Sequence, residues 1–367
     1  MTPFERHLRA LIASEGPITI ERYMSLCVGH YYATRDPFGA RGDFTTAPEI
    51  SQMFGELLGL WSVAVWQAMG SPATLNLIEL GPGRGTLMAD ALRAGRLAPP
   101  FREAVRVHLV EASPTLRAAQ ERTLAEAGVP LAWHPDLASV PEGPTLVIAN
   151  EFFDALPVRQ YVATDRGWCE RLVALDGDAL AFGLFAEPNP TLGRPRRTGD
   201  VAEVPEAGGA LAAALARRLV RDGGAALVID YGTWAPEPKS TLQAVKNHAF
   251  ADPLSDPGEA DLTAHVTFSL LAEAASREGA AVHGPSGQGD FLRTLGIEAR
   301  AEALKGRADQ ARGEAVDAAL RRLTDPGPAG MGELFKVMAF ADPALGHLPG
   351  LEFAPGPSLP QERCDPP

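Results

Sequence analysis

The clearest chemical signature in the sequence is a glycine-rich turn at residues 79–86, which reads Glu-Leu-Gly-Pro-Gly-Arg-Gly-Thr. The apolar run at 75–80 before it predicts a buried strand, and residues 86–94 after it predict a helix. Glycines let the chain bend sharply and let a ligand approach the backbone, and the start of a helix offers free N–H groups. The turn therefore predicts a nucleoside-binding site, although a purely structural turn has the same residue types.

The spacing and charge of this turn distinguish between two classes of cofactor. Dinucleotides favour the spacing G-x-G-x-x-G, with the pyrophosphate at the start of the helix, whereas the glycines here are spaced G-x-G-x-G. The carboxylate that precedes them would repel a pyrophosphate but attract the ammonium group of S-adenosyl-L-methionine. We therefore predict S-adenosyl-L-methionine as the cofactor, bound by Glu79, Gly81, Pro82, Gly83, Gly85 and Thr86.

Further candidate cofactor ligands follow the next three predicted strands. Glu111 ends the second strand, with Ala112 beside it, and a carboxylate there can accept hydrogen bonds from both ribose hydroxyls. Taken alone, Glu111 is also compatible with a solvated strand end. Asp136 and Leu137 follow the third strand, where an acid can accept a hydrogen bond from the adenine amino group. Asn150, which follows the fourth strand, completes the predicted cofactor site.

Two acids, Glu151 and Asp154, follow the fourth predicted strand, at the edge where open α/β sheets bind ligands. Methyl transfer requires mainly positioning and desolvation, and carboxylates pair well with a guanidinium. We predict that both acids are catalytic residues that hold a substrate guanidinium, with Phe152 and Phe153 as walls of the substrate pocket. Alternatively, the two acids cap the helical turn that follows.

His265 is the third candidate catalytic residue, expected near the start of a helix that begins at 261 or 263 and ends at about 278. It can act as a proton acceptor or a pocket wall, or it can be hydrogen-bonded only within the fold. No pair of histidines has the spacing of metal ligands, so no metal is expected. The three cysteines fit neither a disulfide framework nor a zinc site, which indicates a reducing compartment.

The elements that position these residues alternate between strands and helices, which predicts an α/β, Rossmann-like fold with a mostly parallel sheet. Strands at 158–163, 168–175 and 179–185, with a hairpin turn at 176–178, predict an insertion. We expect three regions: an N-terminal helical cap with an aromatic loop at 1–70, a main domain at 71–340 with insertions near 157–205 and 284–325, and a loosely ordered, proline-rich tail at 341–367.

Within the predicted cap, helices are expected at 3–15, at 19–29 and, as one long apolar helix, at about 48–69. The segment 31–44 has aromatic and charged residues but no period, so it is expected to be a loop. A second loop is expected at 232–260.

Composition and charge narrow the functional classes. The 367 residues carry a formal net charge of −13, with a pI near 5.1, which disfavours a nucleic acid as partner. The N-terminus has no signal-peptide pattern, and no run is long and apolar enough for a membrane span. We therefore expect a cytoplasmic protein without a membrane span.

Several segments of the chain together carry a family resemblance: 42–56, 79–88, 110–114, 149–157, 229–232, 252–254, 260–266, 288–297 and 331–337. They resemble the MidA-like class I methyltransferases, a family that includes the mitochondrial complex I assembly arginine methyltransferase and its bacterial relatives. The resemblance implies a seven-stranded methyltransferase sheet with an N-terminal helical cap and an insertion. It also implies that Asp43, Phe44 and Thr46 lie near the active site, and we predict that they bind the substrate together with Tyr231. The family commonly reads His-Val-Asp-Phe where this chain has threonine at 267, so an acid role there is not available.

The leading functional hypothesis is an S-adenosyl-L-methionine-dependent protein arginine N-methyltransferase whose partner is a protein substrate, such as a complex I subunit. The alternative is an assembly factor or chaperone that binds the cofactor without turnover. A nicotinamide-dependent oxidoreductase is disfavoured by the glycine spacing. The sequence leaves open the substrate protein, the degree of methylation and the oligomeric state, a homodimer included.

Overall fold

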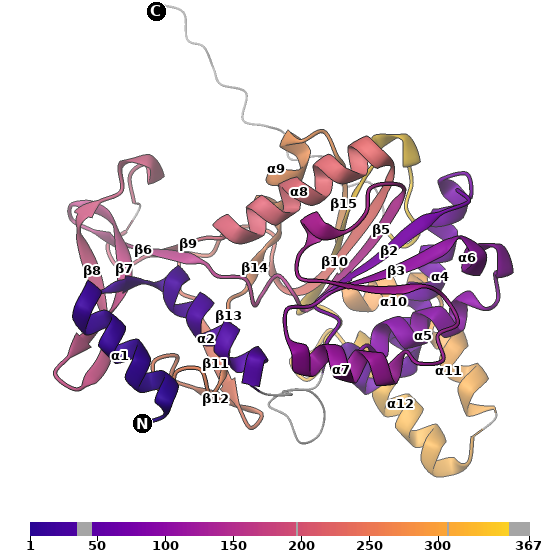
Figure 1. Ribbon diagram of the computed structural model, residues 1–367, viewed down its shortest axis with the longest axis horizontal. Helices are drawn as coiled ribbons and strands as arrows, with labels where there is room; N and C mark the ends of the chain where they lie inside the picture. Colours follow the sequence, from indigo (N-terminus) through magenta and orange to yellow (C-terminus); the bar gives the residue numbers. More distant parts are fainter. Residues whose placement is uncertain (35–45, 196, 307, 352–367) are drawn as a thin grey trace, which may run out of the picture.

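The computed structural model describes residues 1–34, 46–195, 197–306 and 308–351. Its largest part is a twisted sheet with helices on both faces (Figure 1). Seven strands follow one another in the order β15-β16-β10-β5-β2-β3-β4, and the short β14 pairs with the end of β10. The strands are β2 (Leu75–Leu80), β3 (Val105–Val110), β4 (Leu131–His134), β5 (Thr145–Asn150), β10 (Gly224–Thr233), β14 (Val266–Thr267), β15 (Ala281–Gly287) and β16 (Phe335–Ala341).

This sheet confirms the predicted α/β class I methyltransferase fold. The five strands from β4 to β10 are mutually parallel, and β16 runs antiparallel to both of its neighbours. Because the five strands are parallel, their carboxyl ends lie at one edge of the sheet. The glycine turn after β2, Glu111 after β3 and the acids after β5 therefore come together there.

The central strands are buried on both faces, because apolar side chains alternate between two cores. In β5, Leu146 and Ile148 pack on one face, and Val147 and Ala149 pack on the other. The first face is covered by α4 (Gln52–Ala68), α5 (Thr86–Gly95), α6 (Pro99–Ala104), α10 (Gln288–Thr294), α11 (Ile297–Lys305) and α12 (Gln310–Thr324). The second is covered by α8 (Glu206–Asp222) and α9 (Phe268–Arg277), while α7 (Pro114–Thr123) follows β3.

A smaller, strand-rich part lies beside the main sheet and packs against the first two helices (Figure 1). One sheet has the order β1-β7-β6-β9, with β8 paired to β7, and another has the order β12-β11-β13. The elements are α1 (Pro3–Glu15), β1 (Ile18–Thr19), α2 (Ile20–Thr34), β6 (Arg159–Thr164), β7 (Gly167–Asp176), β8 (Ala179–Pro188), β9 (Val201–Val204), β11 (Gln243–Lys246), β12 (Ala249–Ala251) and β13 (Asp261–Thr263).

Four predicted elements differ from the structure. The loop predicted at 232–260 contains the strands β11 and β12. The long helix at 48–69 is broken into α3 (Ala47–Ile50) and α4, because Ser51 is extended and its side chain accepts a hydrogen bond from the Met53 amide. The helix α2 continues to Thr34, so the predicted loop begins later. The helix predicted to begin at 261 or 263 is wrong before residue 268, where β13 and β14 precede α9.

The chain beyond β16 also departs from expectation over the residues that are described. The prediction of a loosely ordered tail is wrong for 342–351, because Leu348 and Leu351 are buried in the core below α4 and α10. The Trp61 indole N–H donates to the Pro349 carbonyl at 3.1 Å. Short 3-10 turns complete the fold: η1 (Leu137–Ser139), η2 (Pro190–Leu192) and η3 (Pro343–Leu345). Among the described helices, none combines the length and apolar character that crossing a membrane requires.

Candidate active site

The glycine turn between β2 and α5 brings bare backbone to the carboxyl edge of the sheet. Gly81, Gly83 and Gly85 all have positive φ angles, of 62°, 53° and 82°. At Gly81 the space is also restricted, because a Cβ atom there would lie 2.7 Å from Cδ2 of Phe152. A side chain at this position would be both strained and crowded, so the structure requires glycine here.

Glu79 is the second-last residue of β2, just before this turn, and its side chain is almost fully buried. Its Oε2 atom has no hydrogen-bond partner among the described residues, and burial raises the pKa of the carboxyl well above its usual range. Glu79 lines a small cavity together with Thr46, Thr86 and Asn150, and the Oδ1 atom of Asn150 is likewise buried without a partner in the described chain. Buried polar atoms are normally hydrogen-bonded. Two residues that line one cavity, each with an unpartnered acceptor, therefore fit a ligand that donates hydrogen bonds.

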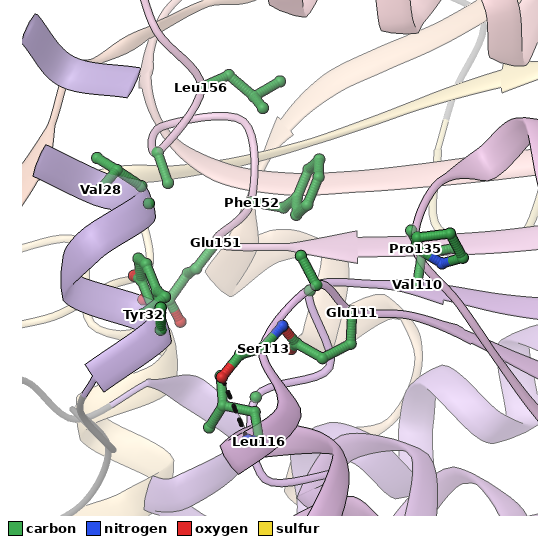
Figure 2. Close-up of a pocket in the computed structure, with 16 residues that line it drawn as sticks. Val28, Tyr32, Val110, Glu111, Ser113, Leu116, Pro135, Glu151, Phe152 and Leu156 are labelled. Atoms are coloured by element: carbon green, nitrogen blue, oxygen red, sulfur yellow. Dashed lines mark hydrogen bonds between the residues drawn. The ribbon is translucent and has the colours of Figure 1, made fainter. Parts of the chain in front are cut away.

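A larger cavity of about 350 Å³ opens next to the turn, between α2, the end of β3 and the segment after β5 (Figure 2). Four of the predicted cofactor residues, Gly81, Gly83, Glu111 and Ala112, line it, and so do Ser113 and Leu116 near the start of α7. Val28 and Tyr32 reach it from α2. Neither was predicted as a site residue, because both are far from the glycine turn in the sequence: Val28 is in the helix predicted at 19–29, and Tyr32 is in the loop predicted at 31–44.

Glu111 is fixed in this cavity by hydrogen bonds from α7 and its N-cap. Its Oε1 accepts from the Ser113 amide at 2.7 Å, and its Oε2 accepts from Nε2 of Gln120 at 3.2 Å. The same Gln120 nitrogen donates to the Gly83 carbonyl at 2.8 Å, which ties Glu111 to the glycine turn. Burial raises the pKa of Glu111. Each carboxylate oxygen has a second lone pair, so Glu111 can still accept hydrogen bonds from a ligand.

Other predicted cofactor residues have local structural roles. The Thr86 hydroxyl donates to Oε1 of Glu49 at 2.6 Å, at the wall of the small cavity, which Pro82 also lines. Asp136 caps η1, where its Oδ1 accepts from the Ser139 amide at 2.9 Å. In this segment it is Pro135 that lines the large cavity, next to Asp136 and Leu137. Contacts from these last two residues to a cofactor stay predictions.

Glu151 is held in an uncommon backbone conformation between the two parts of the protein. Its φ angle is 50°, in the left-handed region, and its amide donates to the Ile229 carbonyl at 2.9 Å. The Oε1 atom accepts from the Ala47 amide at 3.1 Å and from Nδ2 of Asn150 at 3.3 Å. Burial, reinforced by the negative charge of Asp154, raises the pKa of Glu151 to about 8. Strained backbone of this kind often marks a functional position.

Asp230, three residues before the end of β10, organises the segment that follows Glu151. Its Oδ2 accepts three amides, from Phe152 at 3.2 Å, Phe153 at 2.9 Å and Asp154 at 3.2 Å, and its Oδ1 accepts the Tyr231 amide at 2.9 Å. Burial, with the charges of Asp154 and Glu151, raises the pKa of Asp230 well above its usual range. The sequence contained a signal for this residue, an acid directly after an apolar strand, but nothing in it indicated which amides the acid would accept.

A second cavity, also of about 350 Å³, lies on the other side of Glu151, and Glu151 and Tyr32 line both. In Figure 2 the side chains of Tyr32 and Glu151 lie next to each other. Asp154 and Asp261 contribute carboxylates to the second cavity. Oδ1 of Asp154 is buried without a hydrogen-bond partner among the described residues, and burial raises the pKa of Asp154 to about 6. The two cavities thus meet at a carboxylate.

Aromatic and hydroxyl side chains form the walls of the second cavity. The Tyr231 hydroxyl donates to Oγ1 of Thr263 at 2.6 Å, and its ring makes edge contacts with His265 and Phe335, with centroids 5.4 Å and 5.5 Å apart. His265 is in a loop between β13 and β14, and its amide donates to Oγ1 of Thr241 at 2.8 Å. Burial lowers the pKa of His265, which favours the neutral ring.

The remaining predicted substrate residues differ in where the structure places them. Phe152 lines the large cavity and packs on Gly81. Phe153 is instead a core residue, which corrects its predicted role as a pocket wall: it is 5% exposed and packs against α8 near Gly208. Thr46 lines the small cavity. Asp43 and Phe44 lie outside the described residues.

Comparison with known proteins agrees with this geometry. Residues 57–286 match the model of Methyltransf_28, a family of S-adenosyl-L-methionine-dependent methyltransferases. The chain is 40% identical to the mouse protein arginine methyltransferase NDUFAF7, over 84% of this chain and 78% of the mouse protein. It is also 40% identical to the homologue from Drosophila melanogaster, over 94% of this chain and 86% of that protein. A crystal structure from Burkholderia thailandensis with bound S-adenosyl-homocysteine is 32% identical and superposes with a TM-score of 0.80, covering 96% of this chain and 95% of the other.

The fold and the glycine-turn site define a class I methyltransferase. The chain belongs to the Methyltransf_28 family, and it is an S-adenosyl-L-methionine-dependent methyltransferase.

Proposed function

We propose that this methyltransferase modifies a guanidinium nitrogen of an arginine side chain in a protein substrate. The observation that carries the proposal is the meeting of the two cavities at Glu151, with Asp154 and Asp261 on the far side from the glycine turn. A guanidinium stays charged at every physiological pH and pairs with carboxylates through several N–H donors. This arrangement of acids suits such a substrate better than a neutral nucleophile.

The residues around the glycine turn fit the cofactor. Glu79 and Asn150 offer unpartnered acceptors for its ammonium group, and Glu111 offers acceptors for ribose hydroxyls. Gly81 and Gly83 leave room for the ligand beside the backbone. When bound, S-adenosyl-L-methionine supplies a methyl group activated by a sulfonium centre. Within this site the protein mainly positions the two reactants and excludes water.

The acids of the second cavity hold the substrate nitrogen in place and receive its proton. In the transfer, a bond forms between the nitrogen and the methyl carbon, the carbon–sulfur bond breaks, and its electron pair stays on sulfur. The nitrogen then loses a proton, which a carboxylate can accept. Glu151, with a pKa of about 8, lies between the cavities and is matched to this role near neutral pH. His265 also lines the second cavity, and burial lowers its pKa and so favours the neutral ring, which makes it the alternative acceptor.

The identity of the partner rests on the relatives. The mouse and Drosophila proteins are named protein arginine methyltransferases, and they match this chain over most of its length. Together with the acidic cavity, this supports a protein as substrate, and a subunit of respiratory complex I is our candidate. The buried free thiols of Cys27 and Cys169 suit a reducing compartment such as the cytoplasm.

The experiment that tests the proposal supplies methyl-labelled S-adenosyl-L-methionine to an extract from cells that lack the gene. Purified protein is added as wild type or as Glu151→Gln, and labelled peptides are identified by mass spectrometry. We expect strong label on arginine with the wild type and much weaker label with Glu151→Gln. Label on another residue type would contradict the proposal. Cofactor binding without any enzyme-dependent label would instead favour an assembly factor that binds the cofactor without turnover.

A further inference from the structure

The small sheet β12-β11-β13 presents one continuous face to the second cavity. Val245 of β11 is paired with Phe250 of β12 on one side and with Asp261 of β13 on the other. Directly paired residues in adjacent strands point to the same face of a sheet. All three residues line the cavity, so the face changes from a carboxylate at Asp261 to an apolar ring at Phe250 over two strand spacings, or roughly 10 Å.

The apolar end of this face is exposed to an unusual degree. Phe250 is 80% exposed, and Leu334, just before β16, is 50% exposed. Both belong to the lining of the same cavity, and Phe335 continues its wall inward. Water-exposed aromatic rings at the mouth of a pocket are typical of surfaces that bind a partner. The mouth thus combines apolar groups at the rim with acids farther in.

The hairpin that carries Phe250 has a defined geometry. The turn between β11 and β12 consists of Asn247 and His248, both with positive φ, at 51° and 61°. Two consecutive residues of this kind form the type I′ turn that matches the twist of a hairpin. Because β11 also pairs with β13, the position of the Phe250 ring is coupled to that of Asp261.

We propose that Phe250 and Leu334 form an apolar rim that binds a large apolar side chain two residues away from the methylated arginine, in an extended segment of the substrate. This inference rests on the proposed function, since the acids of the cavity would hold the guanidinium. In an extended peptide, residues at i and i±2 point to the same side and are separated by about 7 Å. An apolar side chain at that distance reaches the rim while the arginine occupies the acidic cavity.

The test measures peptide binding to the full-length protein in the presence of S-adenosylhomocysteine. Two fluorescent peptides are compared, with leucine or with serine at both positions two residues from a central arginine. The proteins are the wild type, Phe250→Ser, Leu334→Ser and the control Phe185→Ser, whose ring is 51% exposed on β8. We expect the wild type and the control to bind the leucine peptide about tenfold more tightly than the serine peptide, as burial of one side chain implies.

Both rim variants are expected to lose this preference while keeping their affinity for the serine peptide and for S-adenosylhomocysteine. If the wild type binds the two peptides with equal affinity, or binds neither, the proposed role of the apolar rim is overturned. So does a loss of preference in Phe185→Ser as large as in the rim variants. Methyl transfer from S-adenosyl-L-methionine to the same peptides is read separately. A leucine preference without methylation of arginine would contradict the proposed function while leaving the apolar rim supported.

Discussion

Gly81 and Phe152 are packed so closely that a Cβ atom on Gly81 would lie 2.7 Å from Cδ2 of the phenylalanine ring. The contact joins the turn after β2 to the segment after β5, and both line the large cavity. The shape of the glycine turn therefore depends on residues 151–154, the acidic segment that carries Glu151 and Asp154. A change at either residue is expected to disturb the cofactor side and the substrate side together.

The substitution Gly81→Ala is expected to weaken binding of S-adenosylhomocysteine by tenfold or more and to lower the free energy of unfolding by about 1–3 kcal/mol. Its backbone has a φ of 62°, and the added methyl group would displace Phe152. Gly177→Ala is the matched control, because its φ is 56° and no atom lies within 4 Å of the added Cβ. Calorimetry and urea unfolding measure both effects. Equal losses in the two variants would mean that backbone strain alone is responsible.

Replacement of Glu79 by glutamine removes the charge that the cofactor's ammonium group is expected to meet. We expect S-adenosylhomocysteine to bind about 10- to 100-fold more weakly to Glu79→Gln, because a hydrogen bond to a charged group contributes about 1.5–3 kcal/mol. The exposed Glu187→Gln is the control. Unchanged affinity in a folded Glu79→Gln protein would argue against the role of this carboxylate.

Asp230→Asn tests the organisation of the acidic segment without changing the size of the side chain. The aspartate accepts four amides with its two oxygens, whereas asparagine turns an NH₂ group toward some of them. We expect a loss of about 1–3 kcal/mol in the free energy of unfolding and a fall in kcat. Asp309→Asn at the N-cap of α12 is the control, because aspartate and asparagine cap helices about equally well. If Asp230→Asn is as stable as the wild type, the hydrogen bonds from the amides of residues 152–154 contribute little to the free energy of unfolding.

The activity is expected to rise with pH through the ionisation of Asp154 and Glu151. Their pKa values of about 6 and about 8 lie above the ordinary values because both side chains are buried, so both are neutral at acidic pH. Since the guanidinium keeps its charge throughout, only the ionised carboxyls change its binding. A profile of kcat/KM against pH is therefore expected to increase up to about pH 8. Glu151→Gln should lose the upper step, and a flat wild-type profile would contradict this assignment.

The sequence predicted those features that depend on local pattern. The strand–glycine turn–helix unit and the charge of Glu79 predicted the class of cofactor, and strand–helix alternation predicted the sheet. Asp230 was not predicted as a site residue from its chemistry, because three of its four amide contacts arise only when β5 and β10 lie side by side. The strands β11 to β13 were missed because each has only three or four residues. The break at Ser51 was missed because the apolar pattern continues across it.

The placement of side chains was harder to predict than the elements that carry them. Phe152 and Phe153 are adjacent aromatic residues that the sequence does not distinguish. The amide contacts with Asp230 fix the segment so that one ring faces the cavity and the other enters the core. Tyr32 reaches both cavities because α2 packs beside them, a tertiary relationship that no local pattern encodes.

The central claim is that the two cavities meeting at Glu151 hold the cofactor and an arginine side chain, and a crystal structure with S-adenosylhomocysteine and an arginine peptide tests it most directly. We predict the nucleoside between the glycine turn and Glu111, with the guanidinium within hydrogen-bond distance of Glu151 and Asp154. A guanidinium bound outside the second cavity, or a cofactor bound away from the glycine turn, would contradict the account.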